Sequence, residues 1–158
     1  MQPVGHHLAE LNFGTLRHDW DDPRVAEFVA GLDLVNGLAA RSPGFVWRLS
    51  DSDMGDEQAG DAFGGNPRIA STLSVWVDVA SLQHFVWNTV HRQFFDKRAQ
   101  WYDAIGNSNL VMWWVPVGHR PGVAEGLARF HHLRDHGASA TAFGWDWLKA
   151  AGHPAGGA

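Results

Sequence analysis

Four strand-like segments alternate with helix-like segments along this chain, and their order restricts the folds that it can form. Residues 8–17 alternate apolar and polar side chains, which places Leu11 and Phe13 on one side of a strand and Glu10 and Asn12 on the other. The other strand-like segments are residues 45–49, 68–79 and 109–117. Each of them is rich in the β-branched and aromatic residues that favour a sheet.

Helices are predicted between these strands. The first begins at Pro23, which takes the favoured first helical position, and the second spans residues 81–104. A third runs from Pro121 to about His136. The order is therefore β-α-β-β-α-β with an added C-terminal helix, which is the ferredoxin-like pattern of an α+β domain.

The link between the second and third strands is unusually long. Residues 50–67 are acidic and rich in glycine, so the sequence predicts a loop there, either a solvated hairpin loop or a mobile lid. We expect one domain over residues 1–158, with an ordered core at about 8–145 and a frayed tail at about 150–158.

Charge and composition argue against several classes of protein. A formal net charge of -5 lacks the basic excess that binding to a phosphate backbone requires. The chain has no cysteine, and it carries none of the HExxH, GxSxG or GxxxxGK[ST] motifs. No apolar run approaches the roughly 18 residues of a membrane span, and there is no signal-peptide pattern. We therefore expect a cytoplasmic protein without a nucleic-acid or membrane partner.

The aromatic composition is the strongest indication of function. Nine Trp and nine Phe stand beside ten His. Trp combines a large contact area with a polar N–H, and His changes charge near neutral pH. The sequence therefore predicts an apolar pocket with polar tips, suited to an apolar small molecule. The alternative is that these rings only fill a core and a dimer interface.

Two faces result when residues 82–102 are placed on one helix at roughly 100° per residue. Leu82 and Phe85 belong to an ordinary core face. The second face carries His84, Trp87, His91, Phe94, Phe95, Arg98, Trp101 and Tyr102. Because enclosed His, Arg and Tyr groups must be hydrogen-bonded or wet, we expect this face to line the pocket. The competing interpretation is core and dimer packing.

His91 is the predicted proton-transfer residue, because desolvation between Trp87 and Phe95 would lower its pKa and keep its imidazole neutral. His84 is a candidate partner or second base, and Arg98 a candidate clamp for an anion. The predicted substrate-binding residues are Trp87, Phe95, Trp101 and Tyr102 of this helix and Trp47, Trp76, Trp113, Trp114 and Asn12 of the strands.

Two of these residues, Trp113 and Trp114, are consecutive and must point to opposite sides of their strand, which leaves open which one faces the pocket. A dedicated metal site is not expected, since His84 and His91 are too far apart in sequence for the i, i+4 chelate of a helix.

Most of the chain resembles a known family. The resemblance lies in LAELNFGTL (8–16), DPRVAEFVAGLDLVNGLAARSPGFVWRL (22–49), STLSVWVDVASLQHFVWNTVHRQFFDKRAQWY (71–102) and LVMWWVPVGHRPGVAEGLARFHHLRDHG (110–137). These segments are similar to a bacterial family of unknown function in the dimeric α/β-barrel superfamily, alongside antibiotic biosynthesis monooxygenases. The resemblance implies a ferredoxin-like fold and a homodimer. A dimer is also expected because a sheet with helices on one face leaves the other face bare.

The resemblance also directs the expectation about chemistry. It favours a cofactor-independent oxidation or cyclisation of an apolar, aromatic or polycyclic metabolite in specialised metabolism. One alternative is a haem-dependent dehydratase or peroxidase with His91 as the axial ligand. Another is a small-molecule binding protein that catalyses no reaction.

Overall fold

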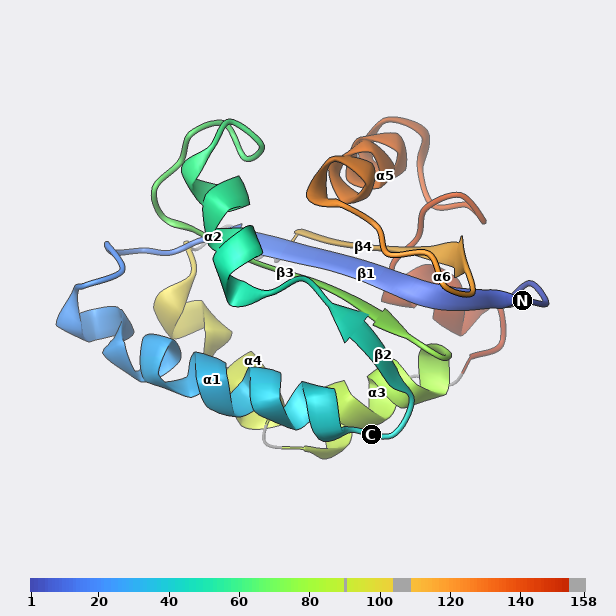
Figure 1. Cartoon of the computed structure of the whole chain (residues 1–158), viewed down its shortest axis with the longest axis horizontal. Coiled ribbons are helices and arrows are strands. Elements are labelled where there is room, and N and C mark those ends of the chain that lie inside the picture. The colour runs from blue at the N-terminus through green and yellow to red at the C-terminus, as the bar shows by residue number, and fades with distance from the viewer. Residues whose placement is uncertain (90, 104–108, 154–158) are drawn as a thin grey trace.

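The structure is a computed structural model that describes residues 1–89, 91–103 and 109–153, and it shows one antiparallel sheet between helices (Figure 1). In chain order its elements are β1 (His6–Thr15), the 3-10 helix η1 (Pro23–Val25), α1 (Ala26–Arg41), β2 (Phe45–Arg48), α2 (Asp51–Ala59), β3 (Ile69–Trp76), α3 (Val79–Asn88), α4 (His91–Trp101), β4 (Asn109–Pro116), α5 (Val123–His136) and α6 (Trp145–Ala150). The predicted α+β class is confirmed, and the four predicted strands are present within a few residues of their expected bounds.

The strands lie in the order β2-β3-β1-β4, so that β1 is paired on both sides. All three pairings are antiparallel. Glu10 of β1 lies opposite Ser74 of β3 and Met112 of β4. Because side chains alternate along each strand, this register sorts the residues of the three strands into two faces.

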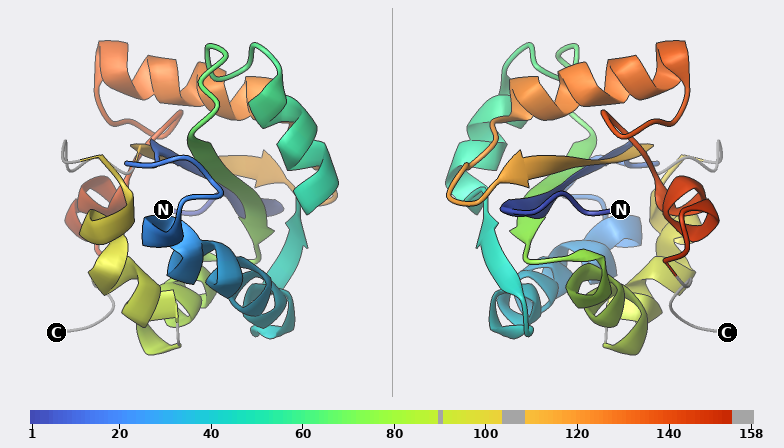
Figure 2. Two further views of the ribbon diagram at one scale, coloured as in Figure 1. Left: turned by 90° about the vertical axis from the view of Figure 1, so that its left-hand side faces the viewer. Right: turned by 90° about the vertical axis from the view of Figure 1, so that its right-hand side faces the viewer.

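One face of the sheet packs against α1, α3 and α4, with α6 beside β4 (Figure 2). Leu8, Trp76 and Met112 point to this side and are fully buried, together with Phe85 of α3. We call it the helical face of the sheet. It is the side on which Glu10 lies, because Glu10 and Leu8 are two residues apart on β1.

The opposite face is covered by α5 and α2, and this corrects the expectation of a bare face (Figure 2). Gly126 lets α5 approach closely, since a Cβ atom there would lie 2.8 Å from the Leu11 side chain and 3.2 Å from that of Trp113. Met54 of α2 is buried in the same core. The argument for a dimer from an uncovered sheet therefore does not hold, because the chain covers this face itself.

The segment predicted as a loop, residues 50–67, contains the helix α2. The Ser50 hydroxyl oxygen accepts the N–H of Asp53 at 3.1 Å and so caps the helix. Burial of Met54, the apolar residue of its first turn, fixes the helix on the sheet. The prediction of a continuous loop is wrong for residues 51–59, which form this helix.

The helix predicted at residues 81–104 is broken into α3 and α4. Thr89 is extended, with φ -126° and ψ -179°. Its hydroxyl donates to the Phe85 carbonyl oxygen at 2.5 Å, and its Oγ1 accepts the N–H of His91 at 3.2 Å. Ser and Thr side chains compete in this way with the backbone bonds of a helix. The two halves consequently do not share one helical face.

The chain continues past the last predicted helix to an ordered segment. Backbone bonds join Phe143 to Met112 of β4, and α6 packs Leu148 into the core of the helical face. Of the predicted frayed tail at 150–158, residues 154–158 lie outside the described part of the chain. Among the helices that the structure describes, none has the length and apolar character needed to cross a membrane.

Candidate functional site

A buried carboxyl stands at the centre of the helical face. Glu10 keeps only 8% of its surface exposed. The Ser74 hydroxyl, directly opposite on β3, donates to Glu10 Oε1 at 3.1 Å. The indole N–H of Trp76 in turn donates to the Ser74 oxygen at 2.9 Å. These three residues form a row of hydrogen bonds across two strands, enclosed by α1 and α3.

Burial gives Glu10 unusual acid–base properties. It raises the pKa of Glu10 to about 7, because the charged carboxylate loses its hydration, while the hydrogen bond from Ser74 acts in the opposite direction. Both protonation states are therefore populated near neutral pH. A carboxyl of this kind can take up or release a proton under physiological conditions.

Two polar atoms on the helical face lack partners. Trp114 Nε1 is, within the described residues, the one side-chain nitrogen or oxygen that is sealed from solvent without a hydrogen bond. Glu10 Oε2 accepts no hydrogen bond from these residues. Trp114 lies on β4 two positions from Met112, the residue opposite Glu10, and so points to the same face. A polar atom of a small molecule would satisfy either group.

His91 lies one aromatic ring away from this row. Its ring centroid is 4.8 Å from that of Phe85, which stacks on Trp76 at 5.2 Å. Its Nδ1 is 3.4 Å from the Val86 carbonyl oxygen. Burial lowers the pKa of His91, in the direction that the sequence predicts, and this favours the neutral imidazole.

The other candidates on α3 and α4 do not gather around His91. His84 is exposed. Arg98 is also exposed, and its guanidinium lies 3.7 Å from the Phe95 ring centroid and donates to the Phe95 carbonyl oxygen at 2.6 Å. Trp87 contacts Phe95 edge-on, with their centroids 5.0 Å apart. The broken helix explains this dispersal, because the predicted face assumed an unbroken one.

Trp101 and Tyr102 belong to a separate core at the end of α4. Both rings pack against Phe28 of α1, and the Tyr102 ring fills the space beside Gly14. Burial raises the pKa of Tyr102. A Cβ atom at Gly14 would come within 2.7 Å of the Tyr102 ring, so both positions are fixed by packing.

The strand candidates divide between the two faces. The helical face carries Trp76, Trp114 and Asn12 together with Glu10. Of the two consecutive tryptophans, Trp114 is therefore the one that points to this face. Trp47 and Trp113 belong to the core under α5 and α2. The Trp113 indole donates to Glu125 Oε1 at 2.9 Å. These two therefore cannot line the same space as His91.

Two residues of this site, Glu10 and Ser74, are absent from the catalytic and substrate-binding residues predicted from the sequence. The alternation of residues 8–17 did place Glu10 beside Asn12, opposite Leu11 and Phe13. Its burial, which makes it chemically special, arises from helices distant in sequence. Nowhere in the described residues do three or more His, Asp or Glu side chains gather so as to hold a metal ion.

The fold and this row of residues together define an α+β protein with a protonatable carboxyl inside an aromatic core. Residues 7–155 match the family described as "Domain of unknown function (DUF3291)", and the chain belongs to that family. No curated protein matches it. Among solved structures it is similar to the NE2512 protein of unknown function from Nitrosomonas europaea, with 15% identity, a TM-score of 0.48, and coverage of 76% of this chain and 99% of the other.

Proposed function

We propose that this protein is an enzyme that transfers a proton to or from an apolar small molecule, with Glu10 as the acid–base group. The observation that supports the proposal is the buried carboxyl, whose pKa burial raises to about 7 and whose Oε2 has no partner among the described residues. A general base works best when its pKa lies near the working pH. Glu10 thus takes the role for which the sequence favoured His91.

The chemistry follows from the groups on the helical face. Oε2 of ionised Glu10 accepts a proton from an acidic C–H or O–H of the substrate, and the electron pair of that bond moves toward the substrate oxygen. The Trp114 N–H, which has no partner among the described residues, is a donor for that oxygen as negative charge develops on it. Trp76 and Phe85, stacked at 5.2 Å, make the surroundings of this row apolar and aromatic.

The class of reaction rests on the resemblance described above. An enolate or phenolate formed by proton removal suits a cofactor-independent oxygenation, in which dioxygen is the oxidant, and equally a cyclisation. Both fit an aromatic or polycyclic metabolite better than a charged one, because the face around Glu10 is apolar. His91, with its pKa lowered by burial, is proposed as a second proton acceptor on the same side of the sheet.

The ferredoxin-like fold and the homodimer are also proposed on the basis of the family resemblance. The strand order β2-β3-β1-β4, with helices between β1 and β2 and between β3 and β4, supports the ferredoxin-like fold. A homodimer and a cytoplasmic location remain predictions. Since α5 and α2 cover the second face of the sheet, a dimer would have to use other surfaces of the chain.

Haem bound at His91 is not supported by the residues present. The His91 ring is packed against Phe85, with their centroids 4.8 Å apart, and its Nδ1 lies 3.4 Å from the Val86 carbonyl oxygen. A binding protein without catalysis is the alternative to be tested. It would take up the same apolar molecules and leave their protons unchanged.

The test measures proton exchange directly. In D2O, 2-tetralone, an apolar ketone with acidic C–H bonds, should gain deuterium faster with the protein than in buffer, and the rate should follow one ionisation near pH 7. Glu10→Gln should lower the protein-dependent rate at least roughly a hundredfold, within the usual contribution of a general base. The control is Glu57→Gln, which removes an exposed carboxylate of α2. Equal rates for the two variants would contradict the proposal.

A further inference from the structure

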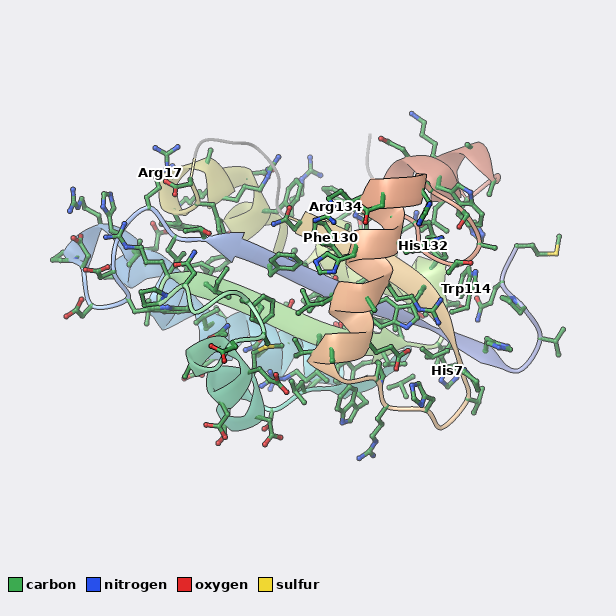
Figure 3. The ribbon with its side chains drawn as sticks, turned by 90° about the horizontal axis from the view of Figure 1, so that it is seen from above. His7, Arg17, Trp114, Phe130, His132 and Arg134 are labelled. Carbon is green, nitrogen blue, oxygen red and sulfur yellow. The ribbon has the colours of Figure 1, made fainter. Side chains whose placement is uncertain are left out.

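A hollow of about 250 Å³ lies on the other face of the sheet, away from Glu10. Its walls come from β1, the turn after α2, the start of β3 and the middle of α5. They are formed by Phe13, Ala62, Phe63, Gly64, Ile69, Leu127, Phe130 and His131. In Figure 3, α5, which carries Phe130, crosses above β1 and so forms the upper wall.

Aromatic rings shape the floor of this hollow. The Phe13 centroid is 5.3 Å from that of Phe63 and 5.0 Å from that of Phe130, the latter pair edge-on. A flat ring placed among them would continue the edge-to-face and tilted contacts that aromatic groups prefer. Gly64 turns the chain with φ +74° and has no atom within 4 Å of its missing Cβ, so space is also open at this corner.

Hydrogen bonds hold the walls in place without a ligand. Gln58 Nε2 donates to the Ser71 hydroxyl at 2.8 Å and ties α2 to β3. Asn66 Nδ2 donates to the Thr15 hydroxyl at 3.0 Å and ties the following turn to β1. A preformed hollow binds a ligand without the cost of ordering its own walls.

We propose that this hollow binds a small uncharged aromatic molecule, independently of the function proposed for Glu10. None of the eight lining residues is Asp, Glu, Lys or Arg, and a buried charge without a partner is costly. The volume is slightly below the roughly 300–1,000 Å³ of drug-sized ligand sites, so the ligand has about ten non-hydrogen atoms. His131, which is exposed, offers one polar contact to it.

Indole is the probe, and the δ1 methyl group of Ile69 is the reporter. The chain has two isoleucines, Ile69 and Ile105, so protein labelled with 13C at these methyl groups gives two signals, which Ile69→Val assigns. Indole should shift the Ile69 signal saturably and give a nuclear Overhauser effect to it. Indole-3-acetate, which adds a carboxylate to the same ring, should bind at least roughly tenfold more weakly.

A matched pair of variants locates the binding. Leu127→Trp fills the hollow and should weaken indole binding at least roughly tenfold, whereas Leu34→Trp, at an exposed position of α1, should leave it unchanged. If Leu127→Trp fails to fold, the Overhauser effect between indole and Ile69 in the unaltered protein shows whether indole binds in the hollow. The proposal is overturned if Ile69 does not respond to about 5 mM indole, or if Leu127→Trp binds as well as Leu34→Trp. It is also overturned if a second copy of the chain fills the hollow, which sedimentation would show as a dimer that excludes indole.

Discussion

Glu10 and Ser74 face each other across the β1–β3 pair, and the Ser74 hydroxyl donates to Glu10 Oε1 at 3.1 Å. Among the described residues this is the hydrogen bond that the carboxyl receives, and it offsets only part of the loss of hydration, because the pKa of Glu10 is still raised. Stability and proton affinity at this position are consequently linked, and both can be measured without knowledge of a substrate.

Glu10→Gln should make stability less sensitive to pH. Burial raises the pKa of Glu10 from 4.5 to about 7, so the native state holds this proton more tightly than the unfolded state does. The contribution of the proton to stability is complete below about pH 4.5 and is lost as pH rises to about 7. Urea unfolding of Glu10→Gln and of the control Glu57→Gln measures this effect. The unfolding free energy of Glu10→Gln minus that of Glu57→Gln should rise by about 3 kcal/mol between about pH 4 and pH 8. A difference independent of pH would show that the carboxyl titrates normally.

Ser74→Ala should push the pKa of Glu10 further upward, because it removes the hydrogen bond that lowers this pKa. The change also leaves the Trp76 indole N–H without its acceptor. We expect a loss of about 1–3 kcal/mol in stability. Carbon-13 NMR of the Glu10 carboxyl measures the titration directly, and an unchanged midpoint would mean that the serine does not act on it.

Two glycines of α1 should respond to alanine in opposite ways. A Cβ atom at Gly31 would overlap the Phe94 ring of α4, so Gly31→Ala should cost about 1–3 kcal/mol. At Gly37 the nearest atom is 3.6 Å away, at the end of the Arg41 side chain. Gly37→Ala should stabilise the protein by about 0.5–1 kcal/mol through helix propensity. Thermal unfolding of both variants tests whether α1 and α4 pack as described.

Phe85→Ala and His91→Ala should differ in severity although the two rings touch. Phe85 is buried and stacked on Trp76, so its loss should cost about 3–5 kcal/mol. His91 is half-buried, and the one polar contact of its ring within the described residues is 3.4 Å long, so we expect about 1 kcal/mol and an intact fold. Unfolding curves compare them. Equal losses would show that His91 serves packing rather than proton transfer.

Sequence patterns predict the sheet well because its signal is local. Alternation along one strand makes Leu11 and Glu10 point to different faces of the sheet, independently of the rest of the chain. The two errors in the helices arise where single side chains override the pattern. Ser50 caps a helix that has few apolar residues, and Thr89 breaks one without help from glycine or proline. Neither position stands out when only the hydrophobic period is read.

The candidate site was predicted less completely, because its character depends on tertiary contacts. The desolvation of His91 could be inferred from its aromatic neighbours in sequence, and its pKa is lowered as expected. Glu10, by contrast, is perturbed by burial under helices from other parts of the chain. The predicted grouping of Arg98 and Trp101 with His91 assumed a continuous helix, and it disappears with the break at Thr89.

The backbone bonds between Met112 and Phe143 have a consequence for solubility. Both N–H groups are used, at 2.8 and 2.9 Å, on the side of β4 that faces away from β1. An open edge strand is a template on which strands from other molecules can add. The bridge to Phe143 closes one position of the β4 edge to such pairing, and the four-residue strand β2 forms the other border of the sheet.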